Sequence, residues 1–213
     1  NPQSSRKIYA AKGRPGDNPL IVHIADMAHL GRIVRAIPER AQKLADAFWP
    51  GPLTLIFEKA AVVPDQTTGG LDTVAVRMPG HLLARRFIQE AGGYVAAPSA
   101  NLSGKPSPTL AKYVIQDMDG RIDMIIDAEG VEIGLESTIV DVTCEVPMIL
   151  RPGFITQQML SGVVGETDMD VTVYDSGSAQ APRAPGMKYR HYAPRGELVI
   201  VDGEPNGVVR YIN

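Results

Sequence analysis

The stretch YVAAPSANLSGKPSPT, residues 94–109, contains the strand-to-loop-to-helix transition on which the fold assignment rests. Its first four residues are apolar and are typical of a short buried strand. The loop that follows is rich in Pro, Ser, Gly and Asn, and Pro108 with Thr109 can open a helix. Ser99 and Asn101 therefore follow the carboxyl end of a strand, where open α/β sheets bind their ligands. The plainer alternative is a capped turn, in which Ser and Asn are common.

The same alternation of elements extends outward from this stretch in both directions. Further strands are predicted at residues 20–24, 53–57, 73–78, 123–127, 137–142 and 148–150. Helices are predicted from Ser4 or Ser5 to Lys12, at 26–37, 38–48 and 79–91, from residue 108, and at 156–160. Strands and helices alternate irregularly, so we predict an α/β fold with a mixed rather than a purely parallel sheet.

Composition excludes several classes of protein. The 213 residues are 44% hydrophobic and 21% charged, which is enough apolar material for a core and excludes wholesale disorder. The single cysteine, Cys144, excludes a disulfide scaffold and a cysteine-based zinc site. No apolar run reaches the roughly 20 residues that cross a bilayer, and residues 1–5 lack a signal-peptide pattern. We expect a soluble, cytoplasmic protein that does not associate with membranes.

Charge is distributed unevenly along the chain. Residues 1–59 hold nine Lys and Arg against five Asp and Glu, a net charge of +4, while the rest of the chain has a net charge of −7. Lys12 and Arg14 flank Gly13, and fixed cations beside a glycine suit phosphate binding. The segment is not a P-loop, and a solvated surface loop is the plainer interpretation. As exposed loop cations, both side chains are expected to contribute little to folding.

Other polar residues lie at strand ends. Arg77 and Arg151 each close a predicted strand, and with Arg14 they can converge on one anion-binding crevice, or simply be solvated. His23 lies inside an apolar strand, where a lone histidine is more often a core residue than a catalyst. The four histidines show no metal-binding spacing.

Six segments, in chain order, resemble the YrdC family of threonylcarbamoyl-AMP synthases. They read KGRPGDNPLIVHI, WPGPLTLIF, VAVRMPGH, APSANLSGKPSPT, GLESTIVDVT and ILRPGFI, and the resemblance covers residues 6–174. The Lys-x-Arg…Ser-x-Asn signature of the family matches Lys12, Arg14, Ser99 and Asn101. A further segment, APGMKYRHYAP at residues 184–194, resembles the linker of the long, two-domain form of this family.

The resemblance implies a YrdC-like twisted mixed sheet with flanking helices and a concave ligand-binding face. It implies a catalytic domain over residues 1–174, an interdomain linker or lid over 175–196, and the first strand of a Rossmann-like second domain within 197–213. The Thr-rich opening segment of the family has no counterpart here, and we expect the chain to be truncated at both ends relative to the long form.

The family makes threonylcarbamoyl-AMP and pyrophosphate from L-threonine, bicarbonate and ATP, for threonylcarbamoyladenosine modification of tRNA next to the anticodon. The resemblance therefore implies these three substrates, downstream tRNA-modifying proteins as partners, and tRNA as a candidate partner. Magnesium is expected to accompany ATP through its phosphates, with no metal ligand from protein side chains.

The resemblance also implies roles for particular residues. The catalytic set is Lys12, Arg14, Ser99 and Asn101. The ATP-binding set is Arg14, Asn18, Thr73, Ser99, Ser107, Arg151 and Tyr192. The threonine-binding set is His23, Arg77, Ala97 and Ser137. Two alternatives stay open: a double-stranded RNA or tRNA-binding module without catalysis, and a carbamoyltransferase-type maturation domain.

Overall fold

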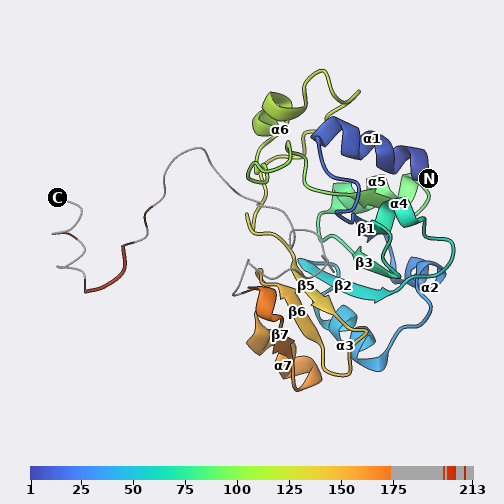
Figure 1. The fold of residues 1–213 in the computed structure, drawn as a ribbon, viewed down its shortest axis with the longest axis vertical. Helices are drawn as coiled ribbons and strands as arrows, with labels where there is room; N and C mark the ends of the chain where they lie inside the picture. Colours follow the sequence, from blue (N-terminus) through green and yellow to red (C-terminus); the bar gives the residue numbers. More distant parts are fainter. Residues whose placement is uncertain (174–198, 200, 205–208, 210–213) are drawn as a thin grey trace.

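A computed structural model describes residues 1–173, 199, 201–204 and 209. Its centre is a seven-stranded sheet in the order β4-β1-β3-β2-β5-β6-β7 (Figure 1). The strands are β1 (Ile21–Ile24), β2 (Leu53–Glu58), β3 (Thr73–Arg77), β4 (Tyr94–Ala97), β5 (Thr138–Asp141), β6 (Met148–Arg151) and β7 (Asp168–Met169). Parallel pairs (β1 with β3, β2 with β5, β6 with β7) alternate with antiparallel pairs. The predicted mixed α/β sheet is confirmed.

Helices are short and surround this sheet. They are α1 (Pro2–Lys12), the 3₁₀ turn η1 (Met27–His29), α2 (Leu30–Ile33), α3 (Glu39–Phe48), α4 (Asp65–Thr68), α5 (Leu82–Glu90), α6 (Ala111–Met118), α7 (Gln157–Val164) and η2 (Val171–Val173). Figure 1 shows α3 and α7 together at one side of the molecule, away from α1 and α6. In the part of the chain that the structure describes, no helix has the length and apolar character to cross a membrane.

The two faces of the sheet carry different residues because side chains alternate along a strand. One face carries Val22 and Ile24 of β1 and packs against α2, α3 and α7, which forms the main hydrophobic core. The other face carries a smaller apolar cluster that contains strand residues only: Ile21, Ile56, Ala75, Ile139 and Leu150. The candidate site residues lie on and around this second face.

Two predicted elements are wrong. Residues 123–127 are not a strand: Met124 is 76% exposed and Ile126 55% exposed, so these apolar side chains do not pack in a core. The helix predicted over 26–37 is shorter, since η1 and α2 end at Ile33 and Val34 instead bridges to Lys59. Asp26 does cap its start, as predicted, by accepting a hydrogen bond from the N–H of Ala28 at 2.9 Å.

Short elements were missed or shifted. No sequence pattern predicted α4 and β7, which have four and two residues. Helices α5 and α6 begin three residues later than predicted, at Leu82 and Ala111. The predicted linker, nearly all of the predicted second domain, and Tyr192 lie outside the described residues.

Candidate functional site

A row of polar side chains crosses the second face of the sheet. His23 on β1 is in register with Arg77 on β3, and Arg77 is in register with Thr54 on β2. Residues paired directly across neighbouring strands point to the same face and lie close together. The sheet order therefore brings together two predicted threonine-binding residues that are separated by more than 50 positions in the sequence.

His23 presents a neutral ring in this row. Burial, reinforced by the nearby Arg77 guanidinium, lowers the pKa of His23 from 6.5 to about 4. Its Nδ1 atom is buried and has no hydrogen-bond partner within the described residues. The backbone of Val95 and of Ile21 lies beside the ring, and the residue as a whole is only partly buried, so another part of the imidazole can face a bound ligand.

Arg77 provides a guanidinium that is partly held by the backbone. Its Nε atom donates a hydrogen bond to the carbonyl of Gly51 at 3.0 Å, and this contact orients the plane of the guanidinium group. Burial, together with the neighbouring Arg151, lowers the pKa of Arg77, but an arginine stays charged at neutral pH. An oriented guanidinium is a strong partner for a carboxylate.

Ser137 extends the row toward β6. Its hydroxyl lies 2.8 Å from the hydroxyl of Thr54, and the terminal nitrogen of Arg151 donates to Ser137 Oγ at 3.0 Å. Thr54 was missed by the sequence analysis. The available signal was its position as the only polar residue in the apolar run of residues 53–57.

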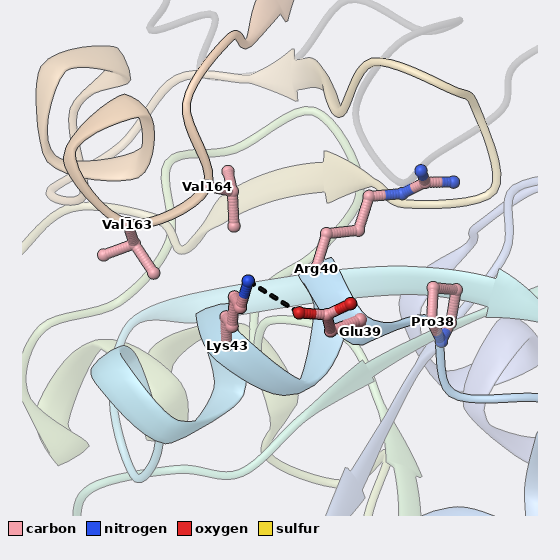
Figure 2. A pocket seen from close by; sticks show the side chains of 6 residues that line it. All are labelled: Pro38, Glu39, Arg40, Lys43, Val163 and Val164. Atoms are coloured by element: carbon pink, nitrogen blue, oxygen red, sulfur yellow. Dashed lines mark ion pairs between the residues drawn. The ribbon is translucent and has the colours of Figure 1, made fainter.

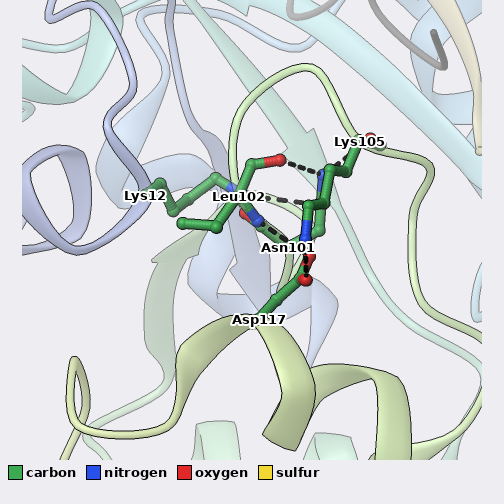
Figure 3. Close-up of polar contacts among 5 residues, drawn as sticks. All are labelled: Lys12, Asn101, Leu102, Lys105 and Asp117. Atoms are coloured by element: carbon green, nitrogen blue, oxygen red, sulfur yellow. Dashed lines mark hydrogen bonds and ion pairs between the residues drawn. The ribbon is translucent and has the colours of Figure 1, made fainter. Parts of the chain in front are cut away.

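Lys12 occupies a second part of the site, where α1 ends (Figure 3). Gly13 adopts a left-handed conformation, with φ of 61°, and ends the helix. The Lys12 ammonium donates hydrogen bonds to the backbone carbonyls of Ser99 and Asn101 in the loop after β4. Lys12 is only 4% exposed, so the expectation of an exposed loop cation is wrong.

The loop after β4 is held by its own polar contacts. The Asn101 side chain donates to the carbonyls of Leu102 and Lys105 at 2.9 and 2.8 Å. Asp117 on α6 accepts from the N–H of Leu102 and pairs with the Lys105 ammonium, as Figure 3 shows. Asn101 therefore shapes the loop in this structure, and the positions of Ser99 and Asn101 depend on Lys12.

Three further predicted ATP-binding residues, Arg14, Asn18 and Thr73, lie at the same end of the strands as Ala97, which was predicted to bind threonine. Arg14 donates to the Asn18 side chain at 2.6 Å and to the carbonyl of Pro19 at 2.9 Å. Thr73 begins β3 and lies on the face that carries Arg77, four residues away and therefore about 13 Å along the strand. Ala97 pairs with Ile21, at the end of β4 that leads to Ser99.

The two parts of the site meet around Glu136. The Ser107 hydroxyl donates a hydrogen bond to the Glu136 carboxylate, whose other oxygen lies 3.7 Å from the guanidinium of Arg151. Ser107 and Arg151 are both predicted ATP-binding residues. Glu136 was not among the predicted site residues, because an acidic residue in a loop ordinarily indicates a solvated surface.

A separate pocket of about 400 Å³ lies between α3 and α7 (Figure 2). Its cations already have partners: Lys43 pairs with Glu39 at 2.7 Å, and Arg40 donates to the carbonyl of Glu145 at 3.0 Å. Helix α3 covers the opposite face of the sheet from His23 and Arg77. None of the predicted site residues lines this pocket.

These features define a class of protein. It is a mixed α/β sheet domain with helices packed on one face and, on the other, cations, hydroxyls and a neutral imidazole. The comparisons with known proteins agree with this class. A family model described as "Telomere recombination" (Sua5/YciO/YrdC) matches residues 1–153, and a model described as "Threonylcarbamoyl-AMP synthase, C-terminal domain" matches residues 155–211.

Individual relatives are closely similar. The threonylcarbamoyl-AMP synthase of Pyrococcus abyssi is 50% identical over 207 residues, which cover 97% of this chain and 61% of the relative. That of Bacillus subtilis is 48% identical over 213 residues, which cover 100% of this chain and 61% of the relative. The crystal structure of P. abyssi Sua5 complexed with L-threonine matches with a TM-score of 0.94 and 50% identity over 99% of this chain and 62% of that chain.

The chain belongs to the Sua5/YciO/YrdC family, and it spans about three fifths of the length of these relatives.

Proposed function

We propose that this chain carries the catalytic site of an L-threonylcarbamoyladenylate synthase. The proposal rests mainly on the row formed by His23, Arg77 and Ser137. A guanidinium suits the carboxylate of threonine, and a neutral imidazole and a hydroxyl suit its ammonium and side-chain hydroxyl. P. abyssi Sua5, which is 50% identical to this chain, was solved in complex with L-threonine, and this supports threonine as the ligand. Ala97 is proposed to contact threonine through its backbone.

ATP is proposed to lie alongside this row, with its triphosphate toward Lys12 and Arg14. Arg151 is the third cation assigned to it. The remaining proposed nucleotide contacts are Asn18, Thr73, Ser99, Asn101 and Ser107. Tyr192 is proposed from the sequence to reach ATP when the linker folds over the site.

The proposed reaction proceeds in two steps. The threonine amine and bicarbonate first combine to a carbamate with loss of water. A carbamate oxygen then attacks the α-phosphorus of ATP, and pyrophosphate leaves as the bond between the α- and β-phosphates breaks. Negative charge increases on the phosphate oxygens, so fixed cations and correct positioning supply most of the catalysis.

Magnesium is proposed to arrive with ATP, bound mainly by phosphates and water. Within the described residues, no group of three or more His, Cys, Asp or Glu side chains is placed to hold a metal ion. The product is proposed to pass to tRNA-modifying proteins in the cytoplasm, with tRNA itself as a candidate partner.

The decisive experiment is an assay of the full chain with L-threonine, bicarbonate and ATP. We expect pyrophosphate and threonylcarbamoyl-AMP to form only when all three substrates are present. Binding of RNA with a steep salt dependence, without any effect of ATP on thermal stability, would instead support the RNA-binding alternative. Adenylate formation from carbamoyl phosphate and not from threonine would support the maturation domain.

Amino-acid selectivity provides a test of the threonine-binding row. We expect serine to be the best competitor of threonine and valine to be rejected more strongly. A missing methyl costs only about 1–3 kcal/mol, whereas loss of the hydroxyl leaves the polar groups that contact it in the complex without that partner. Competition measured by calorimetry, with alanine as a control that lacks both groups, checks this order. Stronger competition by valine than by serine would contradict the assignment of His23, Arg77 and Ser137.

The pH dependence tests the charge of Lys12. Burial, with a contribution from Arg14, lowers the pKa of Lys12 from 10.5 to about 8. We therefore expect kcat/KM for ATP to fall as the pH rises through about 8, because kcat/KM reports the free enzyme and the ammonium is then lost. In Lys12→Met the residual activity should no longer show this alkaline fall. If kcat/KM of the variant falls at alkaline pH just as that of the wild type does, the titrating group is not Lys12.

A further inference from the structure

Glu136 occupies the place where an anion is expected in the proposed nucleotide site. Its carboxylate accepts a hydrogen bond from Ser107 Oγ and lies 3.7 Å from the Arg151 guanidinium. A phosphate group presents the same chemistry, which is negatively charged oxygen that accepts from hydroxyls and guanidinium groups. An internal carboxylate therefore engages two of the groups that the proposed function assigns to ATP.

Arg151 does not depend on this carboxylate for its position. Its Nε and terminal nitrogen donate to the carbonyl of Ser137 at 3.1 and 3.0 Å, and the terminal nitrogen also donates to Ser137 Oγ at 3.0 Å. These contacts fix the plane of the guanidinium beside the start of β5. Removing the charge of Glu136 should therefore leave Arg151 in place. The positive charge of Arg151 would then no longer be partly neutralised by a nearby carboxylate.

The backbone of Glu136 is fixed, whereas its side chain has room to move. A side chain at Gly153 would approach the Glu136 carbonyl to 2.5 Å, which shows how closely the two backbone segments pack. The Glu136 side chain is 31% exposed, and that of Arg151 is 15% exposed. The carboxylate can therefore rotate into solvent without a shift of the backbone.

The charge of Glu136 also acts on both parts of the site. It opposes the lowering of the pKa of Lys12 and that of Arg77. Asp117 is the other carboxylate that acts on Lys12, and Asp117 is already paired with Lys105. Glu136 is thus the carboxylate that offsets cations in both parts of the site.

We propose that Glu136 is an internal placeholder for the phosphates of the nucleotide. Its carboxylate holds Arg151 and Ser107 in the ligand-free protein and gives way when a phosphate binds. Because the carboxylate competes with phosphate for Arg151 and Ser107, it weakens the binding of inorganic phosphate and pyrophosphate. When the carboxylate returns to these two residues, it assists release of pyrophosphate. The identity of the displacing ligand as ATP or pyrophosphate rests on the proposed function.

The test is calorimetric titration of the full chain with inorganic pyrophosphate in the presence of EDTA. Glu136→Gln keeps the size of the side chain and removes its charge. We expect pyrophosphate to bind to this variant about three- to tenfold more tightly than to the wild type, in line with the strength of partly exposed charge pairs. A role limited to structural support predicts unchanged or weaker pyrophosphate binding, so a gain in affinity argues against that role.

Matched variants complete the experiment. Glu132→Gln removes one charge from an exposed residue in the same loop and should change the affinity by less than twofold. Glu136→Ala should change the affinity in the same direction as Glu136→Gln, which covers the case in which the amide disturbs folding. The placeholder proposal is overturned if both Glu136 variants bind pyrophosphate as the wild type does or more weakly. It is also overturned if Glu132→Gln gains as much affinity as Glu136→Gln.

Failure of this proposal and failure of the proposed function are distinguishable. Titration of the wild type with L-threonine and ATP tests the function alone. If both ligands bind but Glu136→Gln gains no affinity for pyrophosphate, the function stands and the placeholder fails. If neither ligand binds and the variant still gains affinity for pyrophosphate, the placeholder stands and the synthase function fails.

Discussion

Replacing Lys12 with alanine should lower pyrophosphate release by about 100-fold or more and also destabilise the protein. Removing one preorganised donor from a site of developing charge typically costs about 10²- to 10³-fold in rate. Here the loss is compounded, because the same ammonium holds the backbone carbonyls of Ser99 and Asn101. Hydrogen bonds from a charged donor contribute about 1.5–3 kcal/mol, so the free energy of unfolding should fall by a similar amount.

Two control variants separate these effects. Lys7 is an exposed cation on the same helix, and Lys7→Ala should change both the rate and the free energy of unfolding only slightly. Lys12→Met keeps most of the buried stem and should recover part of the stability but little of the rate. Pyrophosphate release and urea unfolding, measured on the same preparations, check this pattern. Wild-type turnover in Lys12→Ala would remove Lys12 from the mechanism.

Gly153→Ala is expected to destabilise the protein by about 2–3 kcal/mol, in the upper part of the range for overpacked positions. The added Cβ would lie 2.5 Å from the carbonyl oxygen of Glu136 and 2.7 Å from the backbone nitrogen of Thr138. Both are backbone atoms and cannot rotate away. Thr138 N–H also donates to the carbonyl of Pro52 at 3.0 Å, so a shift would disturb the start of β5 beside β2.

The matched control for this substitution is Gly162→Ala. Gly162 lies within α7, and a Cβ there would meet no atom within 4 Å. Replacing an unhindered helical glycine with alanine should stabilise the protein by about 0.5–1 kcal/mol. The two alanine variants should therefore shift the urea midpoint in opposite directions. If Gly153→Ala is as stable as the wild type, the prediction is wrong, and the backbone at residues 151–153 can shift to accommodate the added Cβ at little cost in free energy.

Local patterns in the sequence were sufficient for most of the regular elements. The buried strands at residues 21–24 and 53–58 are largely apolar runs that begin shortly after a proline, and the helix at 39–48 also follows a proline. Such signals work because they depend on neighbours within a few positions. The exception at residues 123–127 shows their limit, since a short apolar run forms a strand only when another strand offers hydrogen bonds.

The sequence by itself determined the class of fold and the family, and it predicted the loop after residue 97 as a site element. Only the tertiary structure decided which side chains meet. Lys12 is buried because its acceptors, 87 and 89 positions away, return to it through the loop after β4. His23, Arg77 and Thr54 form a row because the order and register of three strands place them side by side. Sheet order and register depend on long-range pairing, and no local pattern of residues encodes that pairing directly.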